Sequence, residues 1–254
     1  MSFKVVIPAR YSSSRLPGKP LLDISGKPMI QHVYQRAQES HATHIIIATD
    51  DERIERVATA FGADVCMTRN DHLSGTDRLA EVVAKRQFAD EDIIINIQGD
   101  EPCLPASLIN QVADDLQQHP DADMASLYNQ ITQEKHVFDP NAVKVIMDKQ
   151  GYALYFSRAP IPWMRDHFDQ QSTLPPELPH YRHIGLYGYR ASFLKHYTDL
   201  EPCVLEQEES LEQLRVLYNG HNIHLTQAMI NPGHGIDTQD DLDEVRKTLN
   251  LAVS

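Results

Sequence analysis

The sequence predicts an α/β protein with a mostly parallel sheet, helices on both faces of that sheet, and an antiparallel insertion in the second half. Short β-branched runs alternate with segments of helical period through the first half of the chain. Strand, helix and strand in this order form a parallel sheet that is covered on both sides. The most apolar run, DIIINIQ at 92–98, predicts a strand that is buried on both faces, as parallel strands usually are.

The first half alternates regularly between the two kinds of element. Pro28 stands where the first turn of an expected helix tolerates a proline, and Gly62 follows the end of the next helix. The expected strands lie at 5–7, 44–49, 65–68 and 92–98, and the expected helices lie at 29–40, 52–61 and 76–87.

The second half has a different pattern. From about 124 to 190 it consists of strand-like pieces such as AVKVIMD and YALYFS, broken by the loop HFDQQSTLPPELPHY. This pattern predicts an antiparallel insertion or a lid region, and we expect the region to support a homodimer. A helix at 206–219, a strand near 223–226 and a final helix at 239–249 follow it. Because the chain has no internal repeat or low-complexity tract, we expect one domain over 1–254.

Composition limits the classes of function. Lys and Arg total 23 against 36 Asp and Glu, for a net charge of -13, which opposes a nucleic-acid partner. Cys66, Cys103 and Cys203 are widely spaced and form no CxxC pair, as expected in a reducing cytoplasm. There is no charged leader before a long apolar segment and no apolar run of membrane-spanning length. We therefore expect a cytoplasmic protein with no membrane partner.

The loop after the first expected strand is basic and rich in hydroxyl groups. It has the sequence PARYSSSRLPGKP at 8–20 and contains no carboxylate. It is not a phosphate-binding P-loop, because Pro20 follows Lys19 and Ser13 stands where the first glycine should be. Open α/β sheets bind ligands at the carboxyl ends of their strands, so an anion is the expected ligand. The alternative is a solvated loop with incidental basic residues.

Longer blocks of sequence point to a family. RLPGKPL followed by GKPMI resembles the signature loop of sugar nucleotidyltransferases, whose lysine and arginine hold the triphosphate of a nucleotide. Further blocks are ATDDERI, SGTDR, NIQGDEP, PNAVKV, YALYFSRAPIPW, HIGLYGYRA, LEQLR and GIDTQDDL. From the first strand to the last helix, these blocks resemble the 3-deoxy-manno-octulosonate (Kdo) cytidylyltransferase family, also called CMP-Kdo synthetases.

This resemblance implies a bacterial cytoplasmic enzyme with a nucleotide-diphospho-sugar transferase-like fold and a single nucleotidyltransferase domain. Such an enzyme joins CTP to the anomeric hydroxyl of Kdo and gives CMP-Kdo and pyrophosphate for lipopolysaccharide biosynthesis. Displacement at phosphorus depends on positioning and on charge, so cations and Mg²⁺ should dominate the site. Two alternatives stay open: a cytidylyltransferase for a related sugar acid, such as an amino-Kdo or a sialic acid, and a non-catalytic CTP-binding module.

The triphosphate of CTP is expected to contact two cations of the opening loop, which we also expect to be catalytic. Lys19 suits a point charge, whereas Arg10 can bind two oxygens at once. The serine hydroxyls of the loop add donors, and residues of the SGTDR and NIQGDEP blocks are expected to face the nucleotide. The expected nucleotide-binding residues are Arg10, Ser12, Ser13, Ser14, Lys19, Ser74, Gly75, Arg78 and Gln98.

Two aspartates are expected to bind Mg²⁺ and to be catalytic through it. Asp100 follows the most buried strand and a glycine that lets a ligand approach the backbone. Asp237 precedes Thr238 and Asp241, which resemble a capping box that opens the last helix and leaves the Asp237 carboxylate for the metal. Magnesium prefers oxygen ligands and usually takes one or two carboxylates. The alternative for each aspartate is a helix or turn cap.

The sugar acid needs a cation for its carboxylate and paired donors and acceptors for its hydroxyls. The residues that resemble the sugar positions of the family are Arg165, His183, Tyr187, Glu212 and Gln213. Their alternative roles are a core position for Tyr187 and an exposed helix face for Glu212 and Gln213. A zinc site at His221 and His224 is disfavoured, because neither HExxH nor a cysteine partner accompanies them.

Overall fold

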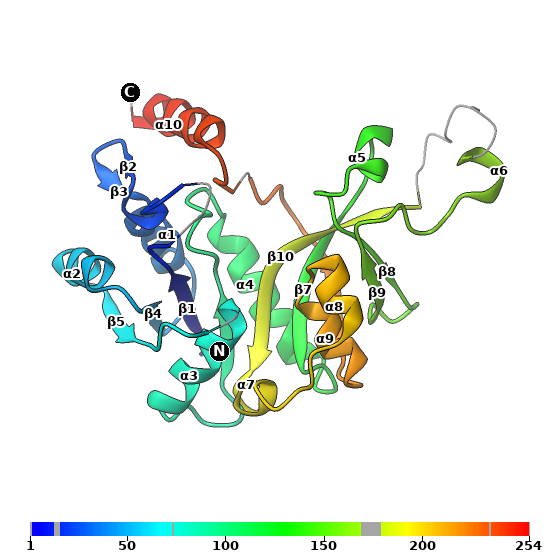
Figure 1. Cartoon of the computed structure of the whole chain (residues 1–254), viewed down its shortest axis with the longest axis horizontal. Coiled ribbons are helices and arrows are strands. Elements are labelled where there is room, and N and C mark those ends of the chain that lie inside the picture. The colour runs from blue at the N-terminus through cyan, green and yellow to red at the C-terminus, as the bar shows by residue number, and fades with distance from the viewer. Residues whose placement is uncertain (1, 13–15, 73, 169–178, 234, 254) are drawn as a thin grey trace.

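The computed structural model describes residues 2–12, 16–72, 74–168, 179–233 and 235–253. One mixed sheet crosses the molecule, from the blue and cyan strands to the green and yellow ones (Figure 1). Its strands, in order, are β11 (Ile223–Gln227), β7 (Met124–Gln130), β10 (Tyr181–Arg190), β6 (Ile93–Asn96), β1 (Lys4–Ala9), β4 (His44–Thr49) and β5 (Asp64–Met67). Among these residues, no helix has both the length and the apolar character that a membrane span requires.

These seven strands form two parallel parts joined by β10, which runs in the opposite direction. Strands β6, β1, β4 and β5 are parallel neighbours, and so are β7 and β11. Strand β10 is antiparallel to both β6 and β7. The predicted mostly parallel sheet is therefore confirmed. The carboxyl ends of β1, β4 and β6 meet at one edge, where open α/β sheets bind ligands.

Helices cover both faces of the sheet, because successive strand residues point to opposite faces and are apolar on both. Val5 packs into one core cluster with Val33 and Val112, whereas Val6 packs into the other with Leu79. The helices of the first cluster are α1 (Met29–Gln38), α2 (Glu52–Ala60) and α4 (Ala106–Gln118), and those of the second include α3 (Gly75–Lys85) and α7 (Ala191–Tyr197).

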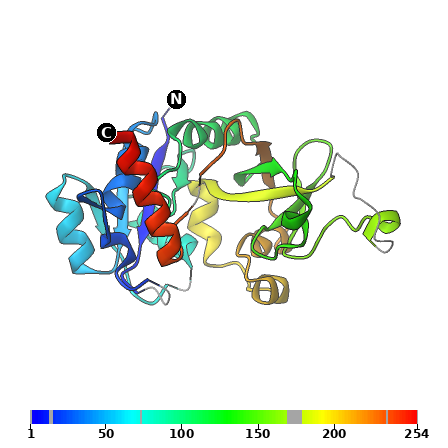
Figure 2. The same ribbon diagram turned by 90° about the horizontal axis from the view of Figure 1, so that it is seen from above.

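The last helix, α10 (Gln239–Val253), returns to the N-terminal part of the chain. Leu242 and Val245 pack against Ile24 and Met29, and Figure 2 shows the red helix lying across the blue elements. Near it are the short elements η1 (Lys19–Leu21), β2 (Asp23–Ile24) and β3 (Lys27–Pro28). This packing places the segment before α10 beside the opening loop.

The expected strands and helices of the first half are all present, with ends shifted by a few residues, but two expectations were incomplete or wrong. Helix α4 was not anticipated. The single helix expected at 206–219 is two helices, α8 (Val204–Glu209) and α9 (Gln213–Tyr218). Ser210 between them has a left-handed backbone with φ of 51°, which a continuous helix cannot contain.

The region expected as an antiparallel insertion begins and ends with strands of the main sheet, β7 and β10. Beside them lies the antiparallel hairpin of β8 (Lys144–Met147) and β9 (Ala153–Ser157), and β8 also pairs with the start of β10. Two short helices, α5 (Glu134–Phe138) and α6 (Arg165–Phe168), lie at the same end of the molecule, with α6 outermost in Figure 1.

Candidate active site

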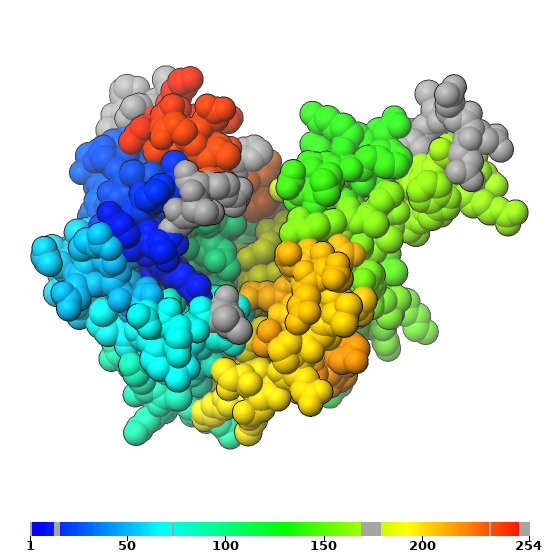
Figure 3. All heavy atoms as spheres, in the orientation of Figure 1, coloured from blue at the N-terminus to red at the C-terminus, as the bar shows by residue number. Residues whose placement is uncertain are grey.

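The molecule is hollowed between its blue and cyan half and its green and yellow half (Figure 3). At the carboxyl ends of β1 and β6 lies a cavity of about 370 Å³. The residues predicted from sequence that line it are Arg10, Ser12, Lys19, Gln98, Asp100 and Asp237. Residues far apart in the sequence thus meet where the parallel strands end.

Lys19 joins the two predicted metal ligands. Its Nζ lies 2.6 Å from Oδ2 of Asp100 and 3.1 Å from Oδ1 of Asp237. The chain reaches this position through Gly18, whose φ of 69° is left-handed. A Cβ atom there would also lie 3.1 Å from the Tyr11 ring, so the turn favours glycine. Two carboxylates therefore converge on one cationic nitrogen.

This pair of carboxylates fits a divalent cation. Magnesium prefers oxygen ligands and often takes one or two carboxylates from a protein. The backbone N–H of Ile236 donates to the carbonyl of Asp100 over 2.9 Å, which fixes the two acidic segments side by side. Thr238 and Asp241 form the predicted reciprocal cap of α10, with N···O distances of 2.7 and 3.2 Å. Asp237 is therefore not the cap of that helix.

Arg10 connects the first strand to the start of α3. Its Nη2 donates to the carbonyl oxygen of Ser74 over 2.9 Å. The Ser74 hydroxyl accepts from the backbone N–H of Asp77, and the Asp77 carboxylate accepts from the Ser74 N–H, which is a capping box. Gly75 is the first residue of the helix. The structure thus brings Ser74 and Gly75 next to Arg10, as expected for one nucleotide site.

Arg78 occupies a different environment from the other predicted nucleotide residues. Its side chain is fully buried, donates to the Thr68 hydroxyl and lies 3.3 Å from an oxygen of Asp50. Burial lowers the pKa of Arg78. In this state the guanidinium contacts the ends of β4 and β5 rather than the cavity. Ser13 and Ser14 lie outside the described residues.

The predicted sugar residues of β10 and α9 are buried and mutually in contact. His183 Nε2 lies 2.9 Å from the Ser126 hydroxyl, and burial lowers the pKa of His183 to about 3. The imidazole is therefore neutral near pH 7. The Tyr187 ring lies 5.4 Å from the His183 ring, centre to centre, and the Tyr187 hydroxyl donates to Gln213 Oε1 over 3.3 Å.

The start of α9 is not the exposed helix face considered as an alternative. Gln213 is only 2% exposed. Burial raises the pKa of the neighbouring Glu212 carboxyl, which places this side chain too in a poorly hydrated environment. Both are thus polar groups turned into the molecule.

Arg165 is separated from the other predicted sugar residues. It lies on α6 and is exposed, and Figure 1 shows α6 at the end of the molecule farthest from β1 and α3. Within one chain in this conformation, Arg165 does not lie beside the other predicted sugar residues.

Comparison with known proteins shows the family to which the chain belongs. A family model described as cytidylyltransferase matches residues 4–223. The chain is 56% identical to the 3-deoxy-manno-octulosonate cytidylyltransferase of Nitrosococcus oceani, over 98% of this chain and 97% of that protein. It is 54% identical to the protein of the same name from Glaesserella parasuis, over the whole of both. The chain belongs to the 3-deoxy-manno-octulosonate cytidylyltransferase family.

Solved structures support the same assignment. The structure of a CMP:2-keto-3-deoxy-manno-octonic acid synthetase complexed with CTP superposes with a TM-score of 0.88, at 42% identity and over 99% of both chains. A 4-diphosphocytidyl-2C-methyl-D-erythritol synthase gives a TM-score of 0.62 at 16% identity, which shows a shared fold. The chain is accordingly a CTP-dependent cytidylyltransferase with the nucleotide-diphospho-sugar transferase fold.

Three polar residues near the cytidylyltransferase site were not predicted. Burial, followed by the charge of Asp100, raises the pKa of Glu101 to about 8. Asn96 pairs with Tyr187 across β6 and β10, and neither polar atom of its buried amide has a hydrogen-bond partner in the part of the chain described here. Thr76 is 1% exposed, and its hydroxyl donates to Glu212. The blocks NIQGDEP and SGTDR contain these residues, but the sequence does not show that their side chains are buried.

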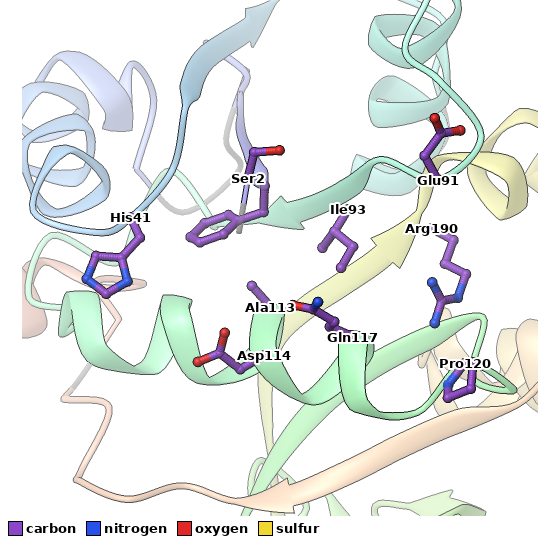
Figure 4. A pocket seen from close by; sticks show the side chains of 10 residues that line it. Ser2, His41, Glu91, Ile93, Ala113, Asp114, Gln117, Pro120 and Arg190 are labelled. Atoms are coloured by element: carbon purple, nitrogen blue, oxygen red, sulfur yellow. The ribbon is translucent and has the colours of Figure 1, made fainter.

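A second cavity, of about 290 Å³, lies at the amino ends of β1 and β6 (Figure 4). Arg190 on its wall donates to the carbonyls of Leu116, His119 and Ala122 and so closes the end of α4. None of the residues predicted for the cytidylyltransferase site lines it. We interpret the Arg190 contacts as structural, because orphan carbonyls at a helix end require donors.

Proposed function

We propose that this chain transfers the cytidylyl group of CTP to the anomeric hydroxyl of Kdo, with Mg²⁺ as its metal, and releases pyrophosphate. The observation that carries the proposal is the convergence of Lys19, Asp100 and Asp237 in the cavity beside Arg10. Relatives more than half identical over nearly the full chain are named as enzymes of this reaction. The product then serves lipopolysaccharide biosynthesis.

The chain's own residues provide binding and charge for the displacement at phosphorus. Arg10 offers a planar pair of donors to phosphate oxygens, and Lys19 offers a point charge. Asp100 and Asp237 would hold the metal, which when bound would offset negative charge on the phosphate oxygens. Positioning of this kind suits a reaction whose transition state needs little covalent assistance.

The sugar site is proposed to lie along β10 and the start of α9. Neutral His183 can accept or donate a hydrogen bond to a sugar hydroxyl, and Tyr187, Glu212 and Gln213 add further polar groups. A site that hydrogen-bonds several hydroxyls rejects an analogue that lacks one of them. Arg165 can neutralise the sugar carboxylate only if α6 moves toward the cavity or a second copy supplies it.

We further propose a homodimer and a cytoplasmic location. An exposed aromatic group lies on α5 and before α6: Phe138 is 47% exposed and Trp163 is 56% exposed, and both rings pack on Phe168. Apolar groups of this kind often mark an interface between subunits. Trp163→Glu should shift the sedimentation of the protein toward the monomer.

The cysteines at 66, 103 and 203 are free, as is usual in a reducing compartment.

A pyrophosphate-release assay tests the central proposal. The wild-type protein should release pyrophosphate only when CTP, Mg²⁺ and Kdo are all present, and addition of EDTA should stop the reaction. Faster release with an amino-Kdo or a sialic acid would reassign the sugar. CTP binding without release from any sugar acid would favour a non-catalytic CTP-binding module.

A further inference from the structure

A chain of hydrogen bonds joins α3 to the start of α9 through Thr76. The Thr76 hydroxyl donates to Oε1 of Glu212 over 3.0 Å, and the Tyr189 hydroxyl lies 3.3 Å from Thr76 Oγ1. Thr76 is 1% exposed, so water does not replace these bonds. Ser74, and not Thr76, caps α3. The Thr76 hydroxyl therefore serves the contact with Glu212 rather than the helix end.

The direction of these bonds follows from the groups involved. Burial and the nearby Glu212 keep the pKa of Tyr189 well above its usual range, so the phenol retains its proton and donates. A threonine hydroxyl has one hydrogen, which Thr76 donates to Oε1 of Glu212. The order is therefore Tyr189 to Thr76 to Glu212.

A second tyrosine of β10 orients the next residue of the same helix start. Tyr187 donates to Gln213 Oε1, so the amide nitrogen of Gln213 must point elsewhere. That buried Nε2 has no hydrogen-bond partner within the described ranges of the chain. Adjacent residues thus present a fixed acceptor, Glu212, and a fixed donor, Gln213. Sugar hydroxyls both donate and accept, so this pair is complementary to a polyol.

We propose that Thr76 is a positioning residue for the sugar acid. From the first turn of the helix that starts at the nucleotide site, its hydroxyl fixes the Glu212 carboxylate in the orientation that binds the sugar hydroxyls. The inference rests on the proposed Kdo transfer and adds to it a residue on which sugar affinity depends. Loss of the hydroxyl leaves Glu212 free to rotate while its neighbours remain in place.

The test removes the hydroxyl without changing the volume of the side chain. Thr76→Val should raise the KM for Kdo about tenfold or more, which corresponds to about 1.4 kcal/mol, while the affinity for CTP in titration stays within about twofold. Thr76→Ser restores the hydroxyl and should return the KM toward the wild-type value. Thr59→Val, on the exposed face of α2, is the matched control and should leave both constants unchanged.

Two outcomes would overturn the inference while wild-type protein still makes CMP-Kdo: an unchanged KM for Kdo in Thr76→Val, or an equal loss of CTP affinity. If Thr76→Val does not fold, Tyr189→Phe decides, because it removes only the donor to Thr76. It should raise the KM for Kdo at an unchanged melting temperature, and an unchanged KM refutes the role. Wild-type protein that releases no pyrophosphate with Kdo refutes the proposed function itself and is thereby distinguished.

Discussion

Replacing Lys19 by methionine separates the catalytic effect of its charge from any effect on stability. The Lys19 side chain is 11% exposed, so methionine retains its buried apolar stem and removes only the ammonium group. The partners are more hydrated: the side chain of Asp100 is 35% exposed and that of Asp237 is 55% exposed. Water screens such pairs, so the free energy of unfolding should fall by about 1 kcal/mol or less.

The expected effect on catalysis is much larger. Removal of a preorganised charge directed at the transition state typically costs about 3 kcal/mol, or about two orders of magnitude in turnover. Pyrophosphate release at saturating CTP, Mg²⁺ and Kdo should therefore fall about 100-fold in Lys19→Met, while the melting temperature changes by only a few degrees. The matched control is Lys27→Met, which removes an exposed lysine from the same segment.

Lys19→Met also tests the fit of the metal. Without the ammonium group, Asp100 and Asp237 repel each other until a divalent cation binds. Addition of Mg²⁺ should therefore raise the melting temperature of the variant more than that of the wild type. Turnover within about threefold of wild type in a folded variant would return the opening loop to the role of a solvated segment.

Three further predictions concern single side chains. Asp237→Asn should abolish most turnover with little change in melting temperature, because Asp237 is not the cap of α10; normal turnover with normal Mg²⁺ dependence contradicts its role as a ligand. Gln213→Ala should raise the KM for Kdo and leave CTP affinity unchanged, and the reverse pattern in titrations would mean that the sugar site is misplaced. The His224 imidazole lies 2.8 Å from the Asp115 carboxylate. Burial lowers the pKa of His224, but the hydrogen bond to Asp115 and the negative charge of Asp115 outweigh burial. The pKa of His224 is therefore raised. Its stabilising contribution is complete below the unfolded pKa of about 6.5 and is lost as pH rises through the folded pKa, so the melting-temperature advantage over His224→Gln should be larger at about pH 6 than at about pH 8.5.

The strands could be predicted from the sequence, because their residues are apolar wherever the sheet is buried. Ile46 and Ile47 face opposite core clusters and are both buried, which produces the continuous apolar run that predicts a strand. Helix α4 carried a comparable signal, since Leu108, Val112 and Leu116 recur at helical spacing on its buried face. The spacing of these residues is therefore sufficient to predict α4 from the sequence.

The break between α8 and α9 had no such local signal. The segment EQEESLEQLR consists of helix-compatible residues. Arg158 ends the first helix from outside: its N–H donates to the Glu209 carboxylate, and its Nε donates to the Glu209 carbonyl over 2.6 Å. These bonds come from the end of β9, so the break depends on tertiary packing. Sequence could identify Glu212 and Gln213 as candidates but could not show which groups orient them.

The direction of β10 explains why the two proposed substrate sites adjoin. Asn96, the last residue of β6, pairs with Tyr187. Because the strands are antiparallel, the part of β10 before Tyr187 extends beyond the carboxyl end of β6, where Asp100 and the opening loop lie. His183 is in this extension, paired with β7 instead. A parallel strand in the same place would end at that edge. The residues before Tyr187, including His183, would then lie toward the opposite edge of the sheet. The reversed direction of β10 thus brings the proposed sugar residues to the edge where we propose that phosphate binds.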